Sequence, residues 1–197
     1  SAAFFPDGKR VASVSADGTL KLWRTGSGTP YKTLRGHAGY VYSVSVSSDG
    51  KQLASGGVDR LIRIWDAESG DRGITLEGHR DAVNSVAFSP KGNYLASGSD
   101  DGSVKVWRLK DGVCVKTFTP GRHPVLAVAY SPDGAYVFSG GGDGTANAWC
   151  AAGDALPTTS PIARPRHASA VGQTSSSVAP HTNSSRLMPG PAAMKMP

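Results

Sequence analysis

The sequence predicts an all-β fold built from repeated four-stranded sheets, and two observations predict it. Three residue types recur in register with a spacing of 42 residues, and the members are Trp23, Trp65, Trp107, Trp149, Asp17, Asp59, Asp101, Asp143, Ser13, Ser55, Ser97 and Ser139. Within each period, short apolar or alternating stretches are separated by turns that contain Gly and Asp, which is typical of antiparallel strands. Such sheets arranged radially form a β-propeller.

One period shows the four expected strands in order. Residues 83–89 (VNSVAFS) are apolar and precede the turn PKG, and residues 93–99 (NYLASGS) lead to the turn DDG. Residues 103–107 (SVKVW) alternate apolar and polar side chains, as in a half-exposed strand. Residues 113–118 (VCVKTF) follow the turn KDG and form the fourth strand. We therefore expect about four blades within residues 1–150.

The first and last blades are incomplete in the sequence. Residues 5–8 (FPDG) align with residues 89–92 (SPKG), so the first blade lacks the loop segment that should precede Asp17, and nothing after Trp149 resembles a fourth strand. The prediction is an open partial propeller of two complete and two incomplete blades. Seven blades at this period would need about 290 residues, which indicates a fragment of a longer propeller. Open blade faces and strand edges predict self-association.

Residues 151–197 have a different composition. Ala, Pro, Ser, Thr and Gly account for 30 of these 47 residues, and no aromatic residue occurs there. Such a segment buries too little apolar surface to offset its chain entropy. We expect a disordered tail.

Composition and charge argue against several classes of function. The net charge is +6, but Lys and Arg form no run along the sequence. We therefore expect no specific nucleic-acid partner. No apolar run approaches the ~20 residues that span a membrane. Cys114 and Cys150 form no metal-spaced pair, which favours reduced thiols in an intracellular protein of the cytoplasm or nucleus. No cofactor loop or metal motif is present, so no cofactor is expected.

Two stretches carry a family resemblance. The segments GHAGYVYSVSVSSDG and GHRDAVNSVAFSPKG, each followed by the periodic Ser, Asp and Trp, resemble the WD-repeat β-propellers over residues 2–150. In that family a loop His bonds to the turn Asp, and Ser and the Trp indole complete the network. The resemblance implies two such sets, which are His37 with Ser55, Asp59 and Trp65, and His79 with Ser97, Asp101 and Trp107.

The same residue types also form catalytic triads. Their recurrence in successive repeats argues against catalysis, because an enzyme needs one site rather than one per blade. The set is broken in the last blade, where Pro120 and Gly121 stand in place of Gly and His. Asp143 therefore lacks its expected histidine partner, and His123 is the nearest histidine that could replace that partner.

The resemblance implies a non-enzymatic scaffold that docks peptides or partner domains. Family partners contact the start of the first strand, the residue before the turn Asp and nearby loops, which here are Tyr40, Tyr42, Val58, Ala82, Asn84, Asp100, Pro124, Leu126 and Gly142. Arg60, beside Asp59 where other turns have Gly, is a further candidate. Two alternatives are a truncated product without independent function and a propeller enzyme. The enzyme is disfavoured because only His123, His167 and His181 lie outside the repeated sets.

Overall fold

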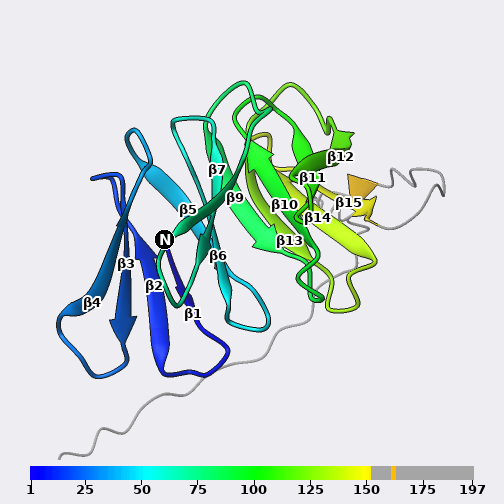
Figure 1. Ribbon diagram of the computed structural model, residues 1–197. Coiled ribbons are helices and arrows are strands. Elements are labelled where there is room, and N and C mark those ends of the chain that lie inside the picture. The colour runs from blue at the N-terminus through cyan, green and yellow to red at the C-terminus, as the bar shows by residue number, and fades with distance from the viewer. Residues whose placement is uncertain (152–160, 163–197) are drawn as a thin grey trace, which may run out of the picture. The chain divides into compact units, whose positions relative to one another are not determined.

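The computed structural model of this chain describes residues 1–151 and 161–162. These residues form four consecutive antiparallel sheets, which we name blades A to D (Figure 1). Blade A contains β1 (Ala2–Phe4), β2 (Arg10–Val14), β3 (Thr19–Arg24) and β4 (Pro30–Arg35), and blade B contains β5 (Val41–Val46), β6 (Gln52–Gly57), β7 (Ile62–Asp66) and β8 (Arg72–Leu76). Blade C contains β9 (Val83–Phe88), β10 (Tyr94–Ser99), β11 (Val104–Arg108) and β12 (Val113–Phe118), and blade D contains β13 (Val125–Tyr130), β14 (Tyr136–Gly141), β15 (Ala146–Cys150) and β16 (Pro161–Ile162).

The prediction of an all-β, open partial propeller is confirmed. The inner strands β1, β5, β9 and β13 pack on one another in chain order, and the arc is not closed between blade A and blade D (Figure 1). No helix occurs among the described residues, and none there could span a membrane. The predicted disordered tail lies, apart from residues 151, 161 and 162, outside the described residues.

Blades A and D are the shortened ones. Strand β1 has three residues and β16 has two, where the matching strands of the other blades have five or six. The expectation that nothing after Trp149 forms a fourth strand was wrong, because β16 pairs with β15 through Ala146↔Ile162 and Asn147↔Pro161. A two-residue pairing uses backbone groups alone, so no alternating side-chain pattern marks it in the sequence.

The hydrophobic core lies between blades. We name the side of a blade that faces the next blade its forward face, and the opposite side its rear face. Three apolar clusters each join the forward face of one blade to the rear face of the next. The first joins Ala12, Leu20, Leu22 and Leu34 of blade A to Val41, Val44, Leu53 and Trp65 of blade B. The second joins Ala54, Ile62, Ile64 and Leu76 of blade B to Val83, Val86, Phe88, Leu95 and Trp107 of blade C. The third joins Ala96, Val104 and Val106 of blade C to Val125, Val128, Val137 and Trp149 of blade D. Each blade is thus stabilised by its neighbours.

Candidate functional site

Blade C contains a chain of four buried polar groups. The indole Nε1 of Trp107 donates to Ser97 Oγ over 2.8 Å, and Ser97 Oγ lies 2.7 Å from Nε2 of His79. Nδ1 of His79 lies 2.9 Å from Asp101 Oδ2. These contacts fit a neutral imidazole that donates from Nδ1 to the carboxylate and accepts the serine hydroxyl at Nε2. Every link is satisfied, which offsets the cost of burying these groups.

Blade B repeats this arrangement with one change. Nδ1 of His37 lies 2.9 Å from Asp59, Nε2 lies 2.7 Å from Ser55 Oγ, and Trp65 donates to the same Oγ over 2.9 Å. In blade C the hydroxyl of Ser103 also donates to Asp101, whereas blade B has Leu61 at that position.

Arg63 replaces the missing hydroxyl of blade B. Its Nη1 donates to Asp59 over 3.0 Å, and the residue is only 7% exposed. The periodic pattern gives no sign of this role, because the matching positions in blades A and C hold Lys21 and Lys105. The buried ion pair therefore distinguishes blade B from the other blades.

Burial controls the protonation of both networks. Burial lowers the pKa of His37 and of His79, and the neighbouring carboxylates offset this only in part. For Asp59 burial acts in the opposite direction, but hydrogen bonds from His37 and from the Ala38 amide hold its pKa below the usual value. The pKa of Asp101 is also lowered, because hydrogen bonds from Ser103, the Arg80 amide and His79 outweigh burial. Neutral histidine facing ionised aspartate is thus the folded form near pH 7.

We expect the folded chain to lose stability as the pH falls below about 6.5, the ordinary histidine pKa. In that range the unfolded state binds protons that the folded histidines do not, so stability falls with pH. The aspartates have lowered pKa values and contribute to a loss only below about 3.8. Urea unfolding at pH 7.5 and 5.5 should show a difference of about 1–3 kcal/mol. The double variant His37→Gln, His79→Gln should be less stable at pH 7.5 and nearly independent of pH; an unchanged pH slope would contradict the assignment.

Blades A and D keep only part of the network. Trp23 donates to Ser13 and Trp149 donates to Ser139, each over 2.8 Å. The turn aspartates accept from a following threonine, and the pairs are Asp17 with Thr19 and Asp143 with Thr145.

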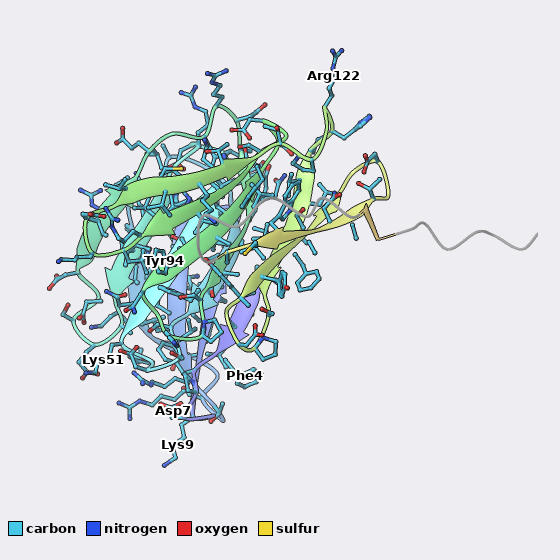
Figure 2. All side chains as sticks on the ribbon, turned by 90° about the vertical axis from the view of Figure 1, so that its right-hand side faces the viewer. Phe4, Asp7, Lys9, Lys51, Tyr94 and Arg122 are labelled. Carbon is cyan, nitrogen blue, oxygen red and sulfur yellow. The ribbon has the colours of Figure 1, made fainter. Side chains whose placement is uncertain are left out.

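The loop of blade D differs from the loops of blades B and C. Residues 120–123 carry Pro-Gly in place of Gly-His, and Arg122 projects from this loop away from the ribbon (Figure 2). Hydrogen bonds from the Thr145 amide and hydroxyl lower the pKa of Asp143, and the charge of His123 adds to this effect. His123 thus acts on Asp143 electrostatically while its side chain is exposed.

The Ser-His-Asp distances in blades B and C match those of a catalytic triad. Their surroundings do not match, because Ser55 and Ser97 are 0% exposed and each hydroxyl oxygen already accepts an indole N–H. A nucleophile must reach its substrate, and these cannot. Among residues 1–151 and 161–162, no group of three or more His, Cys, Asp or Glu side chains could hold a metal ion. The geometry therefore assigns these residues a structural task.

The predicted partner-contact positions are brought together by a recurring backbone bond. The residue before the turn Asp donates its amide to the carbonyl at the start of the inner strand. The three pairs are Val58 to Tyr40 at 2.9 Å, Asp100 to Ala82 at 3.0 Å and Gly142 to Pro124 at 2.8 Å. Three successive blades thus hold the same two positions at one side of the arc.

Large exposed side chains lie at one of these positions, Tyr40, and at two neighbouring residues of the inner strands, Tyr42 and Leu126. Tyr40 is 56% exposed, Tyr42 is 42% exposed and Leu126 is 54% exposed. Arg60 is exposed and has a φ of 66°, in the left-handed region where the matching turns have Gly102 and Gly144. A non-glycine residue in the left-handed backbone region destabilises the fold by about 1 kcal/mol or more. Arg60 adopts this conformation and places its positive charge at the turn.

Asn84 and Asp100 form a polar pair within this surface. Nδ2 of Asn84 donates to Asp100 Oδ1 over 2.5 Å and to the Val125 carbonyl of blade D over 3.1 Å. Asn84 therefore links blade C to blade D in addition to lining the surface. We name the surface formed by Tyr40, Tyr42, Val58, Arg60, Asn84, Asp100 and Leu126 the rim.

Comparison with known proteins places this architecture in a family. A family model described as the IFT122 first beta-propeller matches residues 1–159. The chain belongs to this family of WD-repeat β-propellers. Among curated proteins, 38 residues are 53% identical to Ribosome assembly protein 4 of Chaetomium thermophilum, covering 19% of this chain and 7% of that protein. A stretch of 40 residues is 45% identical to WD repeat-containing protein pop1 of Schizosaccharomyces pombe, covering 20% and 5%.

Solved structures agree with this family. The structure of U3-55K matches with a TM-score of 0.72 and 32% identity over 82% of this chain and 50% of that chain. The crystal structure of RRP9 WD40 repeats matches with a TM-score of 0.70 and 34% identity over 75% of this chain and 46% of that chain. The WD-repeat chain described here thus spans about half the length of these two structures. Propellers of this kind are generally non-enzymatic and act as interaction scaffolds.

Proposed function

We propose that this chain is a non-enzymatic scaffold that docks a peptide or a partner domain on the rim. The observation that carries the proposal is the same backbone bond in three consecutive blades, next to which the side chains of Tyr40, Tyr42 and Leu126 are exposed. Tyrosine is enriched among the residues that dominate binding energy. A rigid display also lowers the entropy lost on binding.

The composition of the rim supports a protein partner. Tyr40, Tyr42 and Leu126 offer apolar contact, and Arg60 and Asp100 offer charges of both signs. A mixed apolar and polar surface suits another protein better than a phosphate backbone, which requires a positive stripe. The name of the relative Ribosome assembly protein 4 supports an intracellular location, and we place this chain in the cytoplasm or nucleus.

The competing functions make different demands on the chain. A propeller enzyme would need an accessible nucleophile or acid–base pair, whereas the hydroxyls of Ser55 and Ser97 are inaccessible. A truncated product without function would lack a cooperative unfolding transition. The three inter-blade clusters support a chain that folds cooperatively.

The double variant Tyr40→Ala, Tyr42→Ala tests the proposal. Loss of two interface tyrosines costs 1–2 kcal/mol or more each, so the affinity for a partner should fall at least about tenfold. Quantitative affinity purification identifies proteins held by the wild-type chain, and titration with one purified partner measures the loss. The matched control is Tyr31→Ala, Tyr94→Ala, whose side chains are 38% and 40% exposed outside the rim. Equal binding by the rim variant, or equal loss by the control, would contradict the proposal.

A further inference from the structure

A hollow of about 450 Å³ lies between blades A and B. It forms where the turn from β1 to β2 and the end of β3 meet the turn from β7 to β8. Successive turns of an antiparallel sheet lie at alternate ends of its strands, so this hollow and the rim lie at opposite ends. Figure 2 shows two of its residues, Asp7 and Lys9, at the opposite end of the blades from Arg122. We name it the basic hollow, and its charged and aromatic side chains are Asp7, Lys9, Arg10, Arg24, Tyr31 and Glu68.

Two arginines of the basic hollow stand directly opposite each other. Strand β2 pairs with β3 through Arg10↔Arg24. The matching pairs of the other described blades contain at most one cation, and they are Gln52↔Asp66, Tyr94↔Arg108 and Tyr136↔Cys150. Like charges that face each other on paired strands destabilise a sheet. Asp7 relieves part of this repulsion, because it accepts a hydrogen bond from Arg10 Nε over 2.8 Å.

The charge of Arg24 is not matched by a carboxylate. Among the described residues, Arg24 forms no ion pair. Its counterpart two repeats later is Arg108, which pairs with Asp111 over 2.7 Å. Blade A has Ser27 at the position of this aspartate. The guanidinium group of Arg24 can therefore pair with a carboxylate from outside the chain.

Aromatic rings hold both guanidinium groups in place. Cζ of Arg24 lies 5.5 Å from the centre of the Tyr31 ring, and Cζ of Arg10 lies 4.3 Å from the centre of the Phe5 ring. A cation is attracted to the face of an aromatic ring, and a side chain that is already held loses less freedom when it binds a ligand. A guanidinium group also offers two parallel N–H donors, which match the two oxygens of a carboxylate.

We propose that the basic hollow binds a carboxylate side chain from an acidic segment of a partner protein. Arg24 pairs with this carboxylate, and Lys9 and Arg10 add positive charge beside it. The balance of charge fits one carboxylate, because three cations line the hollow together with only two anions, Asp7 and Glu68. A nucleic-acid backbone would require a longer row of cations. The site does not use the rim, so it does not rest on the function proposed above.

An NMR titration of the full chain with a synthetic peptide of alternating glutamate and serine tests the site. We expect the Nε–Hε signal of Arg24 to shift until it saturates, and we expect no such shift when glutamine replaces glutamate. Arg24→Gln should weaken binding at least about tenfold, because the charge-assisted pair is lost. The control Arg108→Gln removes the same charge from a side chain that is already paired with Asp111. It should change the affinity by less than about twofold, and cooperative urea unfolding verifies that each variant is folded.

Removing an anion from the hollow gives a test of the opposite sign. Glu68→Gln should strengthen binding about threefold, because the exposed Glu68 carboxylate repels the ligand. Equal binding of the glutamate and glutamine peptides, or an unchanged affinity of Arg24→Gln, would overturn the proposal.

Two further measurements identify the site and the ligand. The rim variant Tyr40→Ala, Tyr42→Ala should bind the peptide as the wild-type chain does. A loss in this variant would place the peptide on the rim and overturn the hollow, while leaving the proposed function of the rim intact. A phosphoserine peptide that binds at least about tenfold more tightly than the glutamate peptide would overturn the choice of a carboxylate.

Discussion

Replacing Trp107 by alanine is expected to lower the free energy of unfolding by about 3–5 kcal/mol, the usual cost of removing a buried tryptophan. Trp107 is 1% exposed and lies in the cluster shared by blades B and C. Its indole also donates to Ser97. The variant loses apolar contact with two blades and leaves the serine oxygen without its donor.

Trp23→Ala is the matched control for this effect. Trp23 makes the same bond to Ser13, but it is only half-buried, because no blade among the described residues covers its rear face. We expect a loss of about 1–2 kcal/mol, less than half that of Trp107→Ala. Urea unfolding under identical conditions measures both losses. Equal losses would show that the tryptophans act within their own blades.

The second large effect is expected for Ser97→Ala. Ser97 Oγ accepts the indole N–H of Trp107 and also lies within hydrogen-bond distance of His79 Nε2. Among the described residues, Ser97 alone makes both contacts. Its removal leaves two buried polar groups unpaired, at about 1–3 kcal/mol each. We expect the free energy of unfolding to fall by about 2–4 kcal/mol, although the change removes a single oxygen atom.

Ser139→Ala provides the comparison in blade D. Ser139 accepts from Trp149, and the loop of that blade lacks a histidine at the position of His79. Only the indole is expected to lose a partner, so the loss should be about 1–2 kcal/mol. Chemical denaturation under identical conditions gives the difference between the two variants. If Ser139→Ala costs as much as Ser97→Ala, the histidine adds nothing to the network.

The 42-residue period was sufficient to predict the blades, and the resemblance to WD-repeat propellers implied the residues that meet in blades B and C. The recurring serine and tryptophan lie on paired strands and meet in all four described blades, whereas the aspartate joins them through a histidine only in blades B and C. Periodicity describes what the repeats share. It could not predict Arg63, which compensates for Leu61 in blade B alone.

Two contacts between segments that are distant in the sequence could not be predicted from it either. Asn84 was expected only at a binding surface, yet its amide joins blade C to the Val125 carbonyl of blade D. Within blade D, the pairing of β16 with β15 covers only Pro161 and Ile162, which is too short for an alternating strand pattern. In both cases the deciding partner lies on a segment distant in the sequence, and a local pattern does not encode that distance.

The sharing of each apolar cluster between two blades has a consequence for how such chains change in length. The recurring unit of stability is the apolar contact between two consecutive blades, which we call a junction, rather than the blade: the four described blades have three junctions. Duplicating an internal blade adds one junction of an existing kind and leaves the others intact. Losing an internal blade removes one junction. The forward face of the preceding blade then meets the rear face of the following blade, and these two faces are of the same kind as those in the existing junctions. Blade number can therefore vary through single duplication or deletion events, without any new core having to be assembled.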